Sequence, residues 1–174
     1  MTAISVLSKI LLAAVAAATV GFPASGQSGR VSGKGVPGPL QTLARPATPV
    51  KAPDEEGFIR RWLVLEPVGA SGLTDGEVQA AVKKEYFPCR LLAIPRDGDR
   101  VTVEGSELEW HAFDTNRYNF NLYHFAYALG KSTSNVLFWA VTIVDCPREF
   151  KAVRLAIGSN AASVWWVNSK EVIG

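Results

Sequence analysis

The feature that most constrains this chain is a series of short strand-forming runs, each closed by a turn signal. Runs rich in β-branched and aromatic residues, repeated about every ten residues, indicate antiparallel strands. They cover residues 58–65, 100–104, 108–113, 119–127, 135–144, 152–157 and 163–168. One stretch has helical spacing instead, with Thr74 and Glu77 as a capping box and Pro88 as the stop. We therefore predict a mainly β domain over residues 57–174, an antiparallel β-sandwich or jelly roll with one short helix.

Residues 1–26 have the three-part pattern of a secretory signal peptide. One positive charge precedes the apolar run 10–20, and a proline and three small residues follow it, ending at Gly26. The alternative is a membrane anchor, but a bilayer needs about 20 apolar residues and this run is shorter. We predict cleavage between Gly26 and Gln27 and export to the periplasm or the extracellular space.

Between the signal segment and the domain, residues 27–56 are dominated by Gly, Pro, Ser and Ala. Such a composition buries too little apolar surface to offset the entropy of ordering its backbone. We predict a disordered linker that tethers the domain.

The charge distribution excludes some partner classes. The net charge is +2 and basic residues form only pairs, which is not the pattern of a nucleic-acid-binding protein. After signal removal no segment is apolar over a length that spans a membrane.

The two cysteines, Cys89 and Cys146, are either one disulfide bridge in an oxidising compartment or two buried thiols. Metal-ligand spacing is absent, because there is no C-x-x-C and His111 and His124 stand apart in sequence. We expect neither a metal nor another cofactor.

The chain ends in a hairpin, 164–173, whose second strand has barely begun. A sandwich needs closing strands to cover its edges and fill its core. We therefore expect the domain to be incomplete at its C-terminus, as in the N-terminal piece of a longer protein, and to be marginally stable and prone to self-association.

Four segments carry a resemblance to a known family: 61–67, 135–144, 153–160 and 164–172. They resemble the galactose-binding-domain-like β-sandwich modules that accompany exported bacterial glycoside hydrolases and carbohydrate esterases. Two positions depart from that family's pattern. Asn160-Ala161 replaces an acidic pair, and Ser169 replaces the glycine of a tight turn.

The resemblance implies a non-catalytic accessory module that binds glycan or braces a catalytic domain. Its partners would be a polysaccharide or a downstream catalytic domain. Adjacent Trp165 and Trp166 must point to opposite faces of a strand, which leaves one of them for stacking on sugar beside Asn168. We select Trp166 with Asn168, and Trp110 with Asn116, as carbohydrate-binding candidates.

Two other functions remain open. The aromatic residues also fit core packing, as in a purely structural or protein-interaction domain. A small hydrolase would use His111 as base and Asp114 as orienter, yet no serine has a nucleophile-elbow context. Glu109 and Asp114 form only the kind of carboxylate pair that many chains offer. We assign no catalytic residue.

Overall fold

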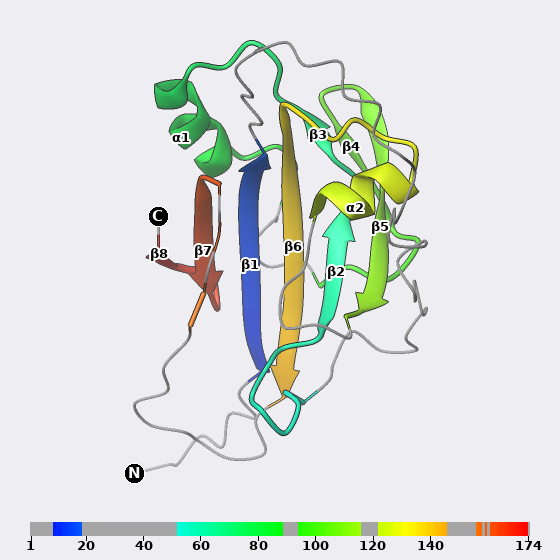
Figure 1. Cartoon of the computed structure of the whole chain (residues 1–174), viewed down its shortest axis with the longest axis vertical. Coiled ribbons are helices and arrows are strands. Elements are labelled where there is room, and N and C mark those ends of the chain that lie inside the picture. The colour runs from blue at the N-terminus through cyan, green and yellow to red at the C-terminus, as the bar shows by residue number, and fades with distance from the viewer. Residues whose placement is uncertain are drawn as a thin grey trace, which may run out of the picture.

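The computed structural model describes residues 9–18, 52–88, 94–115, 122–145, 156–157, 159 and 161–173. Figure 1 shows the strands and the two helices of this part of the chain. The strands are β1 (Lys9–Ala18), β2 (Arg61–Leu65), β3 (Val68–Gly69), β4 (Arg100–Val103), β5 (Ser106–Asp114), β6 (Val136–Asp145), β7 (Ser163–Val167) and β8 (Lys170–Ile173). The helices are α1 (Asp75–Lys83) and α2 (Leu122–Ala128).

The strands form one sheet in the order β4-β5-β2-β6-β1-β7-β8, with β3 also paired to β6. Every strand pair is antiparallel. The prediction of a mainly β, antiparallel fold is therefore confirmed. The described strands belong to this single sheet, and none of them forms the second sheet that a sandwich requires.

Strand β6 is an interior strand of the sheet, and both of its faces are buried. Leu137, Trp139 and Val141 belong to the main hydrophobic core, whereas Phe138 and Ala140 belong to a second core on the other face. A strand that is covered on both faces has an unbroken run of apolar residues. The sequence of β6 has such a run, and this run predicted the strand. Its one polar interior residue, Thr142, is satisfied because its hydroxyl donates to the Arg61 carbonyl oxygen at 2.7 Å.

Helix α1 covers the main core and begins as predicted. The Thr74 backbone N–H donates to Glu77 Oε2 at 2.8 Å, as the expected capping box requires. The Thr74 hydroxyl also donates to Glu77 Oε2, at 2.6 Å. Val78 and Val82 are buried beneath the helix. The helix ends at Lys83 rather than near Pro88, because Lys84 already has an extended backbone, with φ −60° and ψ 142°.

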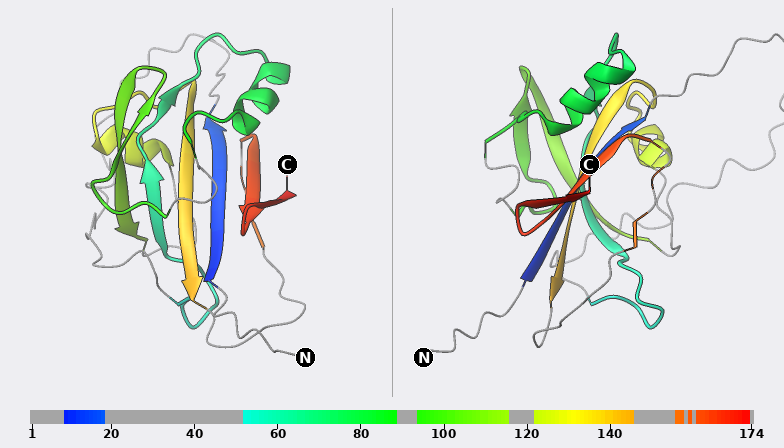
Figure 2. Two further views of the ribbon diagram at one scale, coloured as in Figure 1. Left: turned by 180° about the vertical axis from the view of Figure 1, so that it is seen from behind. Right: turned by 90° about the vertical axis from the view of Figure 1, so that its left-hand side faces the viewer.

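Helix α2 corrects the prediction of a strand over 119–127, of which residues 122–127 are described. Leu122, Phe125, Ala126 and Leu129 recur at helical spacing and pack into the second core. The high β-propensity of the aromatic residues here concealed that spacing. The fold thus has two short helices instead of one, and Figure 2 shows them on opposite faces of the sheet.

The C-terminal hairpin β7–β8 is confirmed. Its turn residues, Asn168 and Ser169, both have positive φ, 49° and 67°, as a two-residue hairpin turn requires. Val164 and Trp166 on β7 are buried within this chain. The hairpin's apolar face is therefore covered by the chain itself.

Strand β1 is the apolar run of the predicted signal segment, and in the 174-residue chain it lies between β6 and β7. Figure 1 shows it in the middle of the sheet. Cleavage after Gly26 stays a prediction. In the part of the chain that the structure describes, neither helix has the length and apolar character to cross a membrane.

Candidate ligand-binding surface

Trp110 lies on β5, and its side chain is almost fully buried in the main core. Its ring meets the Phe87 ring edge to face, with centroids 6.2 Å apart and planes at 86°. This packing explains the burial, and it leaves no open ring face for a sugar to stack on.

A shallow hollow of about 280 Å³ nevertheless opens beside Trp110. Its wall includes Phe87, Pro88, Ile94 and Arg100. The volume is slightly below the usual range for small-molecule pockets, about 300–1,000 Å³. Both charged residues of its wall already have partners. Arg100 pairs with Glu107 and Glu109 of the neighbouring strand, and Asp99 Oδ2 accepts from the Arg96 backbone N–H at 2.7 Å.

Trp166 and Asn168 do not form one surface. Trp166 is buried in the main core, whereas Asn168 is exposed in the hairpin turn. The alternation expected of the adjacent tryptophans is present, because Trp165 is half-buried on the other face, with its ring centroid 6.4 Å from that of Trp62. Among the candidates, Asn116, Cys89 and Cys146 lie outside the described residues.

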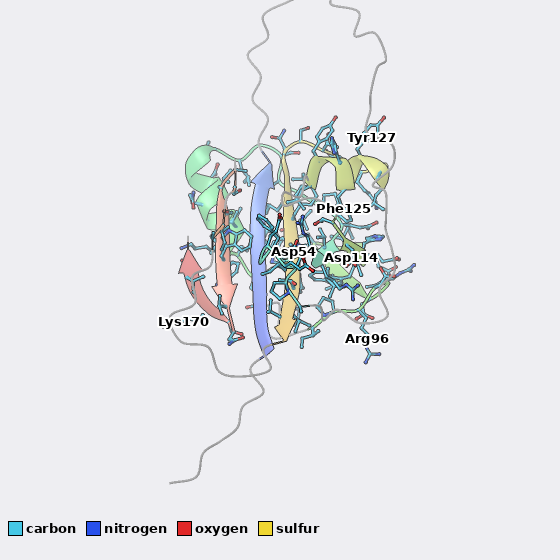
Figure 3. All side chains as sticks on the ribbon, turned by 60° about the horizontal axis from the view of Figure 1, so that its bottom comes forward. Asp54, Arg96, Asp114, Phe125, Tyr127 and Lys170 are labelled. Atoms are coloured by element: carbon cyan, nitrogen blue, oxygen red, sulfur yellow. The ribbon has the colours of Figure 1, made fainter. Side chains whose placement is uncertain are left out.

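Among the described residues the exposed large aromatic side chains are Phe58, Tyr123 and Tyr127, and the last two lie together on α2. Tyr123 and Tyr127 are 45% and 60% exposed, and their rings lie nearly parallel, with centroids 6.3 Å apart and planes at 6°. They are four positions apart on the helix, which places them on one face. Figure 3 shows Tyr127 on the outer side of α2 and Phe125 on the side toward the sheet.

The sequence analysis missed this pair because it expected a strand here. In a strand, residues at positions 123 and 127 also share a face, but they lie too far apart for their rings to meet. The available signal was the helical spacing of the buried residues between and around them, which fixes the opposite face as solvent-exposed.

His111 belongs to a half-buried polar cluster at the end of β2. Its Nε2 atom lies 3.6 Å from Glu66 Oε1, and the Lys131 ammonium lies 3.2 Å from Glu66 Oε2. The His111 ring packs edge to face against Phe125, with centroids 5.7 Å apart. Within the described chain, His111 Nε2 is buried without a hydrogen-bond partner, so no described hydroxyl is placed for His111 to activate.

Asp114 does not orient His111. Its carboxylate is held by the Arg61 guanidinium through two hydrogen bonds, of 2.6 and 2.9 Å. Glu109 likewise pairs with Arg100, at 3.3 Å. These ion pairs account for both carboxylates and give no support to a hydrolase built on them.

No cluster of three or more metal-ligating side chains occurs among the residues placed by the structure. The chain has no match among models of protein families, among curated proteins or among solved structures.

Proposed function

We propose that this chain is a non-catalytic accessory module of an exported carbohydrate-active enzyme, and that it binds glycan through Tyr123 and Tyr127. The exposed, parallel pair of tyrosine rings is the observation that carries the proposal. Single exposed apolar residues are ordinary, whereas an exposed aromatic pair on one face is typical of a binding surface.

The chemistry of the pair suits a sugar. The C–H groups on one side of a pyranose ring form an apolar patch that packs on an aromatic face, while its hydroxyls need polar partners. Tyrosine supplies both a flat ring and a hydroxyl on a side chain with few rotatable bonds, so binding orders little. The two ring planes have nearly the same orientation, with 6° between them.

The helix beneath the rings is rigidly seated. Phe125 and Ala126, between the two tyrosines in sequence, are fully buried in the second core. Phe125 packs on Phe138 of β6 with centroids 6.4 Å apart. The helix that carries Tyr123 and Tyr127 is therefore packed onto the interior strand β6, so the two rings are pre-organised for binding.

The rest of the proposal follows from the sequence. Signal cleavage delivers the module to the periplasm or the extracellular space, and the linker 27–56 holds it at a distance from its neighbours. The resemblance to galactose-binding-domain-like modules supports a β-sandwich as the mature architecture and a downstream glycosidase or esterase domain as the partner.

A second candidate is a purely structural module. The burial of Trp110 and Trp166 favours it, because these aromatic residues then serve the core and need no ligand. Under this hypothesis the tyrosine pair contacts a neighbouring domain, and the module binds no soluble polysaccharide.

Affinity electrophoresis of the exported chain in gels containing soluble xylan, glucomannan or galactan tests the proposal. We expect at least one polysaccharide to retard the chain, and Tyr127→Ala to weaken that retardation by about tenfold in affinity, equal to about 1.4 kcal/mol. Tyr127→Phe should keep most of the affinity because it keeps the ring. Phe58→Ala, a change at another exposed aromatic residue, should have no effect.

Two results would contradict glycan binding at α2. One is migration unaffected by every polysaccharide, which favours the structural module. The other is equal loss for Tyr127→Ala and Phe58→Ala, which would indicate a general effect on the fold rather than a site.

A further inference from the structure

Strand β4 is the last strand at one end of the sheet, and among the described strands it pairs only with β5. Figure 2 shows the hairpin β4–β5 at the other end of the sheet from β8. A strand in this position has backbone N–H and C=O groups on its open side, with which another extended chain can pair. The edge of β4 therefore offers the backbone chemistry for peptide binding by strand addition.

The turn of the hairpin determines which backbone groups of β4 point to the open side. The turn residues Glu104–Gly105 both have positive φ, 48° and 83°, as a two-residue hairpin turn requires. Val103 and Ser106, on either side of the turn, therefore exchange hydrogen bonds, and along an antiparallel ladder such pairs alternate with unbonded pairs. The N–H and C=O groups of Arg100 and Thr102 consequently point away from β5.

The hollow beside Trp110 lies along the same strand. Its wall includes Arg100 and Val101 of β4 and, from the chain that precedes this strand, Phe87 and Ile94. Ile94 is 48% exposed and Val101 is half-buried, so the hollow presents apolar surface to the solvent. The open edge and the apolar hollow therefore form one continuous surface.

A strand added to β4 places one of its side chains in this hollow. Val101 lies two positions from the buried Val103, on the same face of β4, and packs against the main core. Side chains that lie opposite each other on neighbouring strands share a face of the sheet. The added residue opposite Val101 therefore points toward the hollow. Because the charged residues of the hollow already have partners, that added residue should be apolar.

The hairpin and the turn before it are acidic, although the whole chain carries a net charge of +2. Residues 96–109 contain five acidic and two basic side chains. Lys84 adds one more positive charge through its ion pair with Glu104, at 2.7 Å. Negative charge still exceeds positive charge at this end of the sheet, which favours a basic partner.

The position of the excess charge indicates where the basic residue of the partner lies. The single guanidinium of Arg100 pairs with both Glu107 and Glu109. Glu107 lies opposite Thr102 on β5, and its side chain is 63% exposed. A lysine or arginine on the added strand, opposite the small Thr102, can reach across it to this carboxylate. This residue is the sequence neighbour of the apolar residue in the hollow.

We propose that the edge of β4 binds an extended segment of a partner protein, which adds to the sheet antiparallel to β4. The segment carries an apolar residue opposite Val101, with a lysine or arginine next to it. Antiparallel pairing is the geometry of every described strand pair in this sheet. This surface is separate from Tyr123 and Tyr127 on α2, so the proposal does not depend on glycan binding.

Fluorescence anisotropy of a short labelled peptide, titrated with the full 174-residue chain, tests the proposal. The peptide has a leucine between two lysines, flanked by threonine and valine. With the leucine opposite Val101, the backbone N–H groups of the lysines face β4 and that of the leucine faces away. We expect saturable binding, which N-methylation of the two lysine amides abolishes and N-methylation of the leucine amide leaves unchanged.

Substitutions on the protein test the same register. Thr102→Pro removes an N–H group that points to the open side, so it leaves the β4–β5 ladder intact and should weaken binding by at least about fivefold. Thr102→Ala keeps that N–H group and should bind the peptide as the unsubstituted chain does. Ile94→Asn should also weaken binding, whereas Val172→Asn, the same change at an exposed apolar position on β8, should not. Should Thr102→Pro fail to fold, the methylated peptides with the unsubstituted chain decide.

Three results would overturn the proposal. The first is the absence of binding by the unmethylated peptide. The second is the same affinity for the lysine-methylated and leucine-methylated peptides, because strand addition requires them to differ. The third is a dimer in sedimentation that Thr102→Pro dissociates, since a second copy of the chain would then occupy the edge.

Discussion

Arg61 and Asp114 lie 53 positions apart in sequence and form a two-pronged ion pair at the start of β2 and the end of β5. Their side chains are 17% and 23% exposed, so water screens the pair only in part. Hydrogen bonding to Asp114 raises the pKa of Arg61, which keeps the guanidinium protonated. Removing the carboxylate would leave a half-buried cation without a counter-charge.

We therefore predict that Asp114→Asn lowers the free energy of unfolding by about 1–2 kcal/mol, measured by urea denaturation. Glu107→Gln is the matched control, because it removes a carboxylate from an ion pair with Arg100 in which both side chains are more than half exposed. It should leave the urea midpoint unchanged. Equal losses for the two variants would show that the Arg61–Asp114 pair gains nothing from its partial burial.

For single residues, the sequence predicted which face of a strand a side chain lies on, but not which distant residues pack against it. The alternation of Trp165 and Trp166 followed from strand geometry and is confirmed. The burial of Trp110 did not follow, because it depends on Phe87, which comes from a distant part of the chain. The exposed pair Tyr123 and Tyr127 also escaped prediction, since it needs the helical conformation of α2.

Among the elements, α1 shows how much local sequence can determine. Its N-terminus was predictable because a capping box is a contact between residues three positions apart. Helix α2 is short and lacks an acidic residue in its first turn, so its packing on Phe138 outweighs local propensity. Elements fixed by local contacts were predicted, and the element fixed by tertiary packing was not.

The capping box also predicts a pH dependence. Hydrogen bonds from the Thr74 hydroxyl, and then from its backbone N–H, lower the pKa of Glu77 below its ordinary value of 4.5. A lowered folded pKa contributes stability that is present above about pH 4.5 and is lost as the pH falls through the folded value. Glu77→Gln should therefore be less stable than the unsubstituted chain at pH 7.

That difference should shrink steadily as the pH falls below about 4.5. Thermal unfolding of both chains between pH 7 and pH 3 measures it. Thr74→Ala removes the hydroxyl donor, so its stability should fall less than that of the unsubstituted chain as the pH drops below about 4.5. A difference between Glu77→Gln and the unsubstituted chain that stays constant over this range would contradict the role given to the carboxylate.

For the whole molecule, the sequence predicted the class of fold and most of its strands but not their order. The strand sequence β4-β5-β2-β6-β1-β7-β8 places neighbours in the sheet that are distant in the chain. Such pairings depend on which apolar faces bury each other, and several orders satisfy the same alternation. The central position of residues 9–18 was outside the prediction because the same run reads as a signal segment.

At the scale of the whole molecule, the central proposal is that glycan binds to the tyrosine pair on α2. The most direct test is an amide-resolved NMR titration of the exported chain with oligosaccharides of whichever polysaccharide retards it in a gel. We expect saturable shifts that concentrate on α2, around Tyr123 and Tyr127, with the hairpin β7–β8 unchanged. Shifts that centre on the hairpin, or no shift anywhere, would contradict it.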